Sequence, residues 1–248
     1  MVDFVVVPER TALWNVDMQN CFVHGYPFSA PHGLAVQDRI NRVAAACRAA
    51  GILVIHACQV LRPDGSNSGV LVEIAPIVKQ GIINKGSESA ALHRGLFVDP
   101  RDILLEKPRF GAFHGTDLEL ILCSRGIDSV IITGIAINVC CETTAREATV
   151  RDFRVFFLRD GTTTFDIGDV SAAELQRATC ATLGLLFAQV LTIDDMIKKI
   201  SAATRSAVPW LKFRESMSSN LRPLIALGTS GDWQALMVAS RRATSKTR

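Results

Sequence analysis

Three reactive side chains, Asp17, Lys107 and Cys140, each follow a short apolar stretch that reads as a β-strand. The thiolate form of cysteine is the nucleophile, and a helix N-terminus or a nearby cation lowers the pKa of a thiol. Cys140 lies at the start of a predicted helix, and Lys107 would be the cation. Asp17 could take the thiol proton and later pass it to a leaving amine. Together the three residue types predict cysteine-based hydrolysis that needs neither histidine nor a metal.

Strands and helices alternate from Thr11 to about Ile200, and this order decides where the three residues meet. The predicted strands are Thr11–Asp17, Ile52–Cys58, Ile103–Leu105, Ser129–Gly134, Arg154–Leu158 and Phe187–Leu191. The predicted helices are Asp38–Ala50, a short one near Leu71–Val78, Thr116–Arg125, Asn138–Arg151 and Ser171–Leu186. This alternation predicts a three-layer α/β/α fold with a parallel, doubly wound sheet of about six strands. Function in such sheets sits at the carboxyl ends of the strands, where all three residues fall.

Two of the predicted helices carry local boundary signals. Thr116 followed by Glu119 predicts a capping box at the start of one helix. Gly51 stands directly after another helix, where a C-cap glycine belongs.

Composition excludes several classes of protein. Hydrophobic residues make up 48% and charged residues 21%, which allows a sizeable core and excludes a disordered chain. The mean hydropathy is +0.25, yet no apolar run reaches the ~18 residues that span a bilayer, and Met1–Arg10 lacks a secretory-signal pattern. The net charge of +3 is too mild to imply nucleic acid. Seven cysteines, odd in number and without a CxxC pair, favour a reduced, cytoplasmic chain.

The end of the chain differs in charge from the rest. Residues 201–248 hold eight Lys or Arg and two Asp or Glu, a net charge of +6, whereas residues 1–200 carry −3. We therefore expect a hydrolase domain over 1–200 and a basic C-terminal extension over 201–248. Because the extension is too apolar for a free arm, Trp210–Leu236 is expected to pack on the body or on a neighbouring subunit, and Arg241–Arg248 to be disordered. We expect a homodimer or larger oligomer in which the Trp210–Leu236 segment docks on a body, and the alternative is that it folds back on its own subunit.

Three separated motifs carry a resemblance to a known family. They are DMQN at Asp17–Asn20, KPRFGAF at Lys107–Phe113 and TGIAINVCCETTAREA at Thr133–Ala148. Through them, roughly residues 8–200 resemble the isochorismatase-like cysteine hydrolase family, most closely its amidases of the ureidoacrylate amidohydrolase type. The stretch Leu183–Ile197 is also similar to the family's final helix and strand.

The resemblance implies a role for each motif residue. Asp17 would be the acid/base, Lys107 the electrostatic helper, and Cys140 the nucleophile. The thioester formed on Cys140 would release ammonia or an amine first and would then be hydrolysed by water. The family also implies a cis peptide between Ile135 and Ala136, and an oxyanion hole made by the amides of Ala136 and Cys140. The implied function is a cofactor-independent amidohydrolase that cleaves a C–N bond of a small amide, ureide or carbamoyl compound.

Residues near the motifs are candidates for the substrate site. Asn20 and Phe22 follow Asp17 in its loop, and Phe113 ends the second motif. Ile137 stands where the family often has threonine, and it could make the pocket more apolar or simply pack. The weaker candidates, for hydrogen bonds or for a substrate carboxylate, are Tyr26, His114, Arg62 and Arg109.

Departures from related families narrow the chemistry. Cys141 stands where the family often has valine and is expected to point into the core, with a resolving thiol as the alternative. Nicotinamidases of the superfamily hold a metal through an Asp-x-His pattern, but the region from His56 to Gly65 lacks the second histidine. No metal site and no cofactor are therefore expected. True isochorismatases lack the cysteine, so Cys140 argues against vinyl-ether chemistry.

Other functions stay open at this point. They are a hydrolase of another bond type on the same scaffold, a catalytically silent binding or scaffold protein, and a thiol redox sensor built on Cys140 and Cys141. The intact trio argues against a silent protein. The expected partners are a small-molecule substrate and further copies of the chain, with neither nucleic acid nor a membrane.

Overall fold

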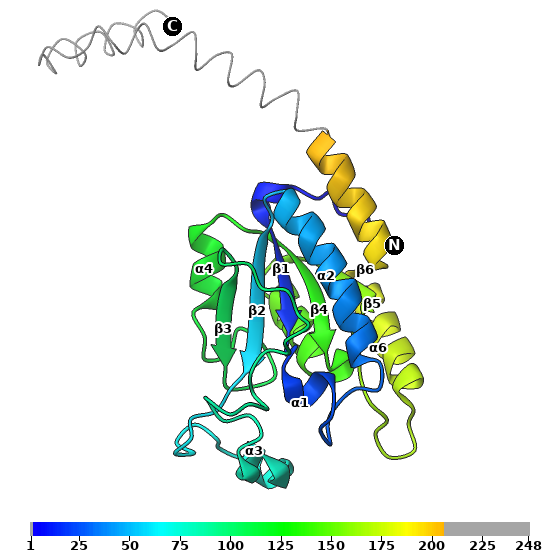
Figure 1. Cartoon of the computed structure of the whole chain (residues 1–248). Coiled ribbons are helices and arrows are strands. Elements are labelled where there is room, and N and C mark those ends of the chain that lie inside the picture. The colour runs from blue at the N-terminus through cyan, green and yellow to red at the C-terminus, as the bar shows by residue number, and fades with distance from the viewer. Residues whose placement is uncertain (1, 206–248) are drawn as a thin grey trace, which may run out of the picture. The chain divides into compact units, whose positions relative to one another are not determined.

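The computed structural model of the chain describes residues 2–205, whose centre is one six-stranded parallel sheet (Figure 1). The strands are β1 (Thr11–Val16), β2 (Leu53–Gln59), β3 (Ile103–Lys107), β4 (Ser129–Ile135), β5 (Arg154–Thr163) and β6 (Gln189–Leu191). Their order is β3-β2-β1-β4-β5-β6, and every neighbouring pair is parallel. The chain thus winds outward from β1 on one side and outward from β4 on the other, which confirms the doubly wound sheet.

Helices connect the strands. The α-helices are α1 (Asn20–Val23), α2 (Gly33–Ala49), α3 (Leu71–Ile74), α4 (Leu118–Ser124), α5 (Glu142–Thr149) and α6 (Ala172–Leu186), and residues 193–205 are also helical. Two 3₁₀ helices, η1 (Pro8–Arg10) and η2 (Pro76–Gln80), and one turn of π-helix, η3 (Ile137–Cys141), complete the described part.

The two faces of the sheet pack into separate cores. In β1, Ala12 and Trp14 belong to a cluster with side chains of α4, α5 and α6, whereas Leu13 belongs to a cluster with α2 and the helix at 193–205. All positions of β1 and β4 are buried, as expected for a parallel sheet that is covered on both faces. The predicted three-layer arrangement is therefore confirmed.

The start of α2 differs from the prediction, because the helix begins at Gly33 rather than near Asp38. A Cβ atom at Gly33 would lie 2.2 Å from the carbonyl oxygen of Val23, at the end of α1. Only glycine allows this close approach of the two backbones. The extra turn of α2 thus depends on a contact between segments, which periodicity within the helix does not reveal.

The predicted capping box at Thr116 is wrong. Helix α4 begins at Leu118, and the side chain of its N-cap residue, Asp117, makes no capping hydrogen bond. Thr116 Oγ1 instead donates to the carbonyl of Ala112 at 2.6 Å and accepts from the Leu118 N–H at 3.2 Å. The Thr116 hydroxyl therefore donates its hydrogen bond within the turn that precedes α4. A capping box is present at α6, where Ser171 and Glu174 bond reciprocally.

Several expectations fall on residues outside the described part. Of the expected extension at 201–248, only 201–205 are described, so the expected packing of Trp210–Leu236, the expected disorder of Arg241–Arg248 and the expected oligomer stay predictions. Within residues 2–205, none of the helices combines the length and the apolar character that crossing a membrane requires.

Candidate active site

The carboxyl ends of β1, β2 and β3 bring three polar residues to one edge of the sheet. Asp17 follows β1 directly, and its backbone N–H donates to the carbonyl of Ala57 in β2 at 2.7 Å. Gln59 and Lys107 are the last residues of β2 and β3, and they are partners in the β2–β3 register. Asp17 has a φ of 53°, in the left-handed region that few residues other than glycine adopt. Such conformations cluster at functional sites.

Asp17 and Lys107 form a fully buried ion pair. Lys107 Nζ donates to Asp17 Oδ2 at 2.8 Å and to the carbonyls of Arg109 and Phe110 at 3.1 and 3.0 Å. All three donors of the ammonium group are therefore used. Asp17 Oδ1 accepts no hydrogen bond from the described residues, although it is buried. One oxygen of the carboxylate is thus free to accept a proton.

Burial and mutual charge set the protonation states of this pair. Burial raises the pKa of Asp17, and the charge of Lys107 only partly opposes the shift. Burial alone would lower the pKa of Lys107, but the Asp17 carboxylate raises it above its ordinary value. Lys107 therefore stays a cation, and Asp17 is a stronger base than a solvent-exposed carboxylate.

The segment that carries Cys140 is placed by a close contact between β4 and β1. Gly134 has a φ of 127°, and a Cβ atom there would lie 2.0 Å from the carbonyl oxygen of Val16. The peptide between Ile135 and Ala136 is cis, as the family resemblance implies. Ala136 then caps the π-helical turn η3, which contains Cys140. The motif glycine thus lets the end of β4 lie directly against the end of β1, where Asp17 follows.

Cys140 is a buried thiol beside this ion pair. Its Sγ atom lies 4.0 Å from Gln59 Oε1. Burial raises the pKa of Cys140 above its ordinary value, and the Asp17 charge adds to the rise, while Lys107 and the Ala136 N–H oppose it. The predicted lowering of this pKa is wrong, because desolvation of the thiolate outweighs the nearby cation. Cys140 therefore rests as a thiol that needs a base.

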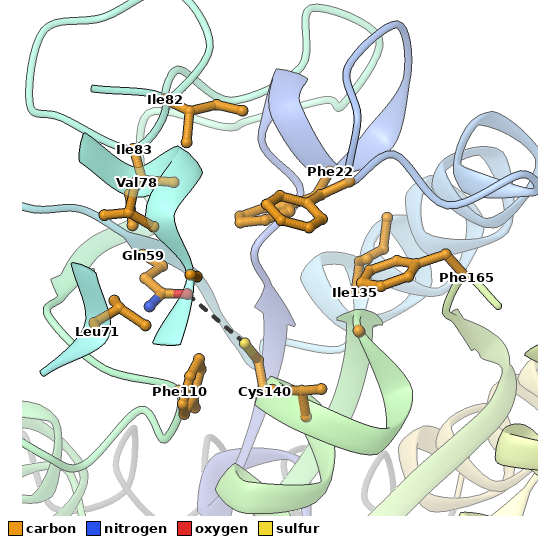
Figure 2. Close-up of a pocket in the computed structure, with 14 residues that line it drawn as sticks. Phe22, Gln59, Leu71, Val78, Ile82, Ile83, Phe110, Ile135, Cys140 and Phe165 are labelled. Atoms are coloured by element: carbon orange, nitrogen blue, oxygen red, sulfur yellow. Dashed lines mark hydrogen bonds between the residues drawn. The ribbon is translucent and has the colours of Figure 1, made fainter. Parts of the chain in front are cut away.

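A cavity of about 150 Å³ opens at Cys140 (Figure 2). Its lining comes from β2, β4, the turn η3 with its cap, the segments after β1, β3 and β5, and the region from α3 to Ile83. The lining residues are Phe22, Phe28, Gln59, Leu71, Ala75, Val78, Ile82, Ile83, Phe110, Ile135, Ala136, Val139, Cys140 and Phe165. Of the predicted site residues, Phe22 and Ala136 line this cavity together with Cys140.

The other three substrate-site candidates do not line this cavity. Asn20 Nδ2 donates to the carbonyl of Glu88 at 2.7 Å, at the start of α1. The ring of Phe113 packs 5.3 Å from that of Trp14, within the core below α4 and α5. Ile137 is fully buried in the same core. Each side chain is engaged elsewhere, so a substrate role for Asn20, Phe113 and Ile137 has no support from the lining of this cavity and stays a prediction.

The weaker candidates also lie away from the cavity. The guanidinium of Arg109 donates to the carbonyls of Asn67 and Pro108 at 2.9 and 2.7 Å. Arg62 and His114 are exposed, and Tyr26 packs partly buried beside α1. None of these four residues is part of the lining. The expectation for Cys141 is confirmed, because it is buried in the core and its thiol donates to the Thr133 carbonyl at 3.9 Å.

Gln59 is the polar lining residue that the sequence analysis missed, along with most of the apolar ones. Its backbone is fixed by Gln19, whose side chain exchanges hydrogen bonds with the Gln59 N–H at 2.8 Å and carbonyl at 3.1 Å. Its side chain is left to face Cys140. A signal was present, since Gln59 is the polar residue that follows a buried strand, as Asp17 and Lys107 do.

The residues present do not suggest a metal centre. Among residues 2–205, no group of three or more His, Cys, Asp or Glu side chains lies close enough to share an ion. His56 is fully buried inside β2 and pairs with Asp102 at 3.0 Å, away from the cavity. The side chains at Cys140 therefore fit chemistry by the thiol itself.

Comparisons with known proteins find relatives over most of the chain. A sequence model of the isochorismatase domain matches residues 11–195. The ureidoacrylate amidohydrolase RutB of Methylorubrum extorquens is 35% identical over 175 residues, covering 62% of this chain and 70% of that protein. The protein of the same name from Klebsiella variicola is 31% identical over 218 residues, covering 79% and 89%. A crystal structure of a cysteine hydrolase from Pseudomonas syringae pv. phaseolicola matches with a TM-score of 0.76 and 32% identity, covering 82% of this chain and 97% of that one.

Proposed function

The chain belongs to the isochorismatase family, and from this premise we propose that it is a cysteine-dependent amidohydrolase. It cleaves the C–N bond of a small amide, ureide or carbamoyl compound through a thioester on Cys140. The observation that carries the proposal is the buried Lys107–Asp17 pair, whose free Oδ1 atom lies in the same site as the Cys140 thiol. The similarity to proteins named ureidoacrylate amidohydrolase supports C–N bond hydrolysis.

The first half-reaction forms the thioester. Asp17 Oδ1 accepts the thiol proton, and the thiolate of Cys140 attacks the substrate carbonyl carbon. The carbonyl oxygen becomes an oxyanion, which the N–H groups of Ala136 and Cys140 stabilise. When the intermediate collapses, the C–N bond breaks and the protonated Asp17 gives its proton to the leaving nitrogen. Ammonia or an amine departs, and the acyl group stays on sulfur.

The second half-reaction regenerates the thiol. Asp17 takes a proton from a water molecule as that water attacks the thioester carbonyl. The C–S bond then breaks, and Cys140 recovers its proton from Asp17. The acyl group leaves as a carboxylic acid, or as a carbamic acid when the substrate is a carbamoyl compound. One water is consumed per C–N bond.

Lys107 is the electrostatic part of this mechanism. Its positive charge opposes the rise that burial causes in the pKa values of Asp17 and Cys140. It therefore keeps Asp17 ionised as a base and stabilises the thiolate in the moment before attack. Its bonds to the Arg109 and Phe110 carbonyls hold the ammonium group in place for both steps.

The proposal is tested by ammonia release from a panel of amides, ureides and carbamoyl compounds. Cys140→Ala is expected to lower kcat by at least roughly 10⁴-fold while the thermal midpoint stays close to that of the wild type. Cys141→Val is the matched control, because its neighbouring thiol lies in the core, and it is expected to keep most of the activity. Activity of Cys140→Ala within tenfold of the wild type would reject Cys140 as the nucleophile.

A further inference from the structure

The cavity beside Cys140 is almost entirely apolar. Of its fourteen lining residues, Gln59 and Cys140 alone have polar side-chain atoms. Figure 2 shows these two side chains facing each other, with aromatic and aliphatic side chains around them. Phe22, Ile135 and Phe165 lie on one side, and the residues contributed by the region from α3 to Ile83 lie on the other. A bound acyl group therefore meets hydrocarbon in most directions.

No cation among the lining residues is available for a charged substrate. Lys107 is fully buried, is not part of the lining, and donates its three hydrogen bonds to Asp17 and two carbonyls. Arg109 is held by the Asn67 and Pro108 carbonyls, and Arg62 is exposed outside the lining. A carboxylate placed in this cavity would lose its water without gaining a partner, which is strongly unfavourable.

The one polar anchor is a neutral carboxamide. The Gln59 side chain pairs with no described residue other than Cys140, whose Sγ lies 4.0 Å from Gln59 Oε1. A carboxamide offers one acceptor and two donors, and an uncharged amide offers the complementary set. Gln59 thus matches the reacting amide group itself rather than a distant charge.

Size sets the rest of the substrate. A cavity of about 150 Å³ lined by Leu, Ile and Phe is large enough for benzene. Resting on the proposed amidohydrolase function, we propose that the substrate is a small uncharged carboxamide whose acyl group is a single apolar ring or a short branched chain. Discrimination against a carboxylate-bearing acyl group is part of the proposal, and it separates this chain from an enzyme that acts on ureidoacrylate, which carries a carboxylate.

The test measures kcat/KM of the full chain for matched primary amides. From acetamide to propanamide and butanamide, each methylene group is expected to raise kcat/KM by about fourfold, as burial of one CH₂ predicts. The charge is isolated by 4-methylpentanamide and 4-amino-4-oxobutanoate, since the first carries an isopropyl group where the second carries a carboxylate. The neutral amide is expected to be hydrolysed at least roughly 100-fold faster.

A variant tests whether the cavity itself makes the selection. Phe165→Ala removes a ring from the wall and enlarges the cavity. The preference for 3-phenylpropanamide over butanamide is therefore expected to rise by about tenfold or more. Phe97→Ala is the matched control, because Phe97 is exposed and outside the lining, and it is expected to leave this ratio unchanged. If Phe165→Ala does not fold, the substrate series on the wild type decides alone.

The outcomes separate this inference from the proposed function. Hydrolysis of 4-amino-4-oxobutanoate or ureidoacrylate within tenfold of 4-methylpentanamide would overturn the apolar substrate class and leave the amidohydrolase standing. If the preference for 3-phenylpropanamide over butanamide rises equally in Phe97→Ala and in Phe165→Ala, the lining does not set that preference. Absence of ammonia release from every amide and ureide would reject the proposed function, and the inference with it.

Discussion

Two buried carboxylates, Asp17 and Asp102, lie at opposite ends of two strands of the sheet, β1 and β3, and have opposite surroundings. Asp17 follows β1, at the carboxyl ends of the strands, where the cavity opens. Asp102 precedes β3, at the amino ends of the strands. Both form a short ion pair, Asp17 with Lys107 at 2.8 Å and Asp102 with Arg48 at 2.5 Å. Burial of a charged pair is therefore common to both sites and cannot by itself identify the functional one.

The difference lies in what each carboxylate has left to bond. Arg48 donates to both oxygens of Asp102, and His56 and the Asp99 N–H complete its surroundings. Although burial would raise the pKa of Asp102, these hydrogen bonds lower it below its usual value. The pKa of Asp17 is raised instead, and its Oδ1 atom accepts no hydrogen bond from the described residues. A satisfied carboxylate stabilises the fold, whereas an incompletely satisfied one beside a thiol can move a proton.

The largest expected effect comes from breaking the pair at the cavity. Lys107→Ala should lower kcat by about 10³-fold or more, because Asp17 then loses its counter-charge, takes up a proton and ceases to be a base. The same variant should lose about 3–5 kcal/mol of unfolding free energy, the cost of removing one partner from a buried ion pair. Lys107→Arg should not restore kcat, since a planar guanidinium cannot replace the compact ammonium between two carbonyls. Steady-state kinetics with urea denaturation measures both effects, and a kcat within tenfold of wild type in Lys107→Ala contradicts the electrostatic role.

Breaking the other pair should affect stability and spare the chemistry. Asp102→Asn removes the charge that Arg48 and His56 share, and it should lower the free energy of unfolding by about 3 kcal/mol. The kcat/KM of the folded variant should stay within about threefold of the wild type at 25 °C, because Asp102 lies at the far edge of the sheet. A loss of more than 100-fold in kcat/KM at unchanged stability would show that this network serves the reaction.

The smallest expected effect is a difference in acid sensitivity between the two carboxylates. Asp17 must be ionised to act as the base, and burial raises its pKa above 3.8, so kcat/KM should fall tenfold per pH unit below a midpoint above that value. Asp102 has a lowered pKa, so its contribution to stability is present above its unfolded value and is lost only as the pH falls through the folded one. Acidification should therefore remove activity before structure.

Parallel records of kcat/KM and circular dichroism from pH 8 to pH 3 check this order. Asp102→Asn is the control, and it should leave the acid limb of kcat/KM where it is. Loss of activity and of structure at the same pH would mean that the acid limb reports unfolding rather than titration of Asp17.

Local patterns predicted the fold and the three reactive residues, whereas the orientation of the side chains near them depends on tertiary contacts. Buried strands such as β4 are apolar through their centre, so their position and the parallel sheet follow from the sequence. The polar residues after those strands meet because the sheet aligns their ends. Asn20 and Phe113 lie within a few residues of the reactive ones, yet a partner elsewhere in the fold claims each side chain. Nearness along the chain does not specify which way a side chain points.

The protonation state of Cys140 was beyond sequence reasoning for a related reason. A helix start and a lysine favour a low thiol pKa, but the balance depends on how completely the site is desolvated. That quantity belongs to the packed cavity wall, including Gln59, whose orientation depends on its bonds to Gln19.

The central claim is that Asp17 and Lys107 serve a nucleophilic Cys140, and the most direct measurement is the mass of the enzyme during turnover. The wild type is mixed with an excess of amide, quenched in acid before the steady state, and digested for peptide mass analysis. We expect the peptide containing Cys140 to gain the mass of the acyl group, in Cys141→Val as in the wild type. The corresponding peptide of Cys140→Ala should gain none. An acyl group on another residue, or an unmodified Cys140 peptide under conditions where the acyl-enzyme of the wild type must accumulate, would contradict the account.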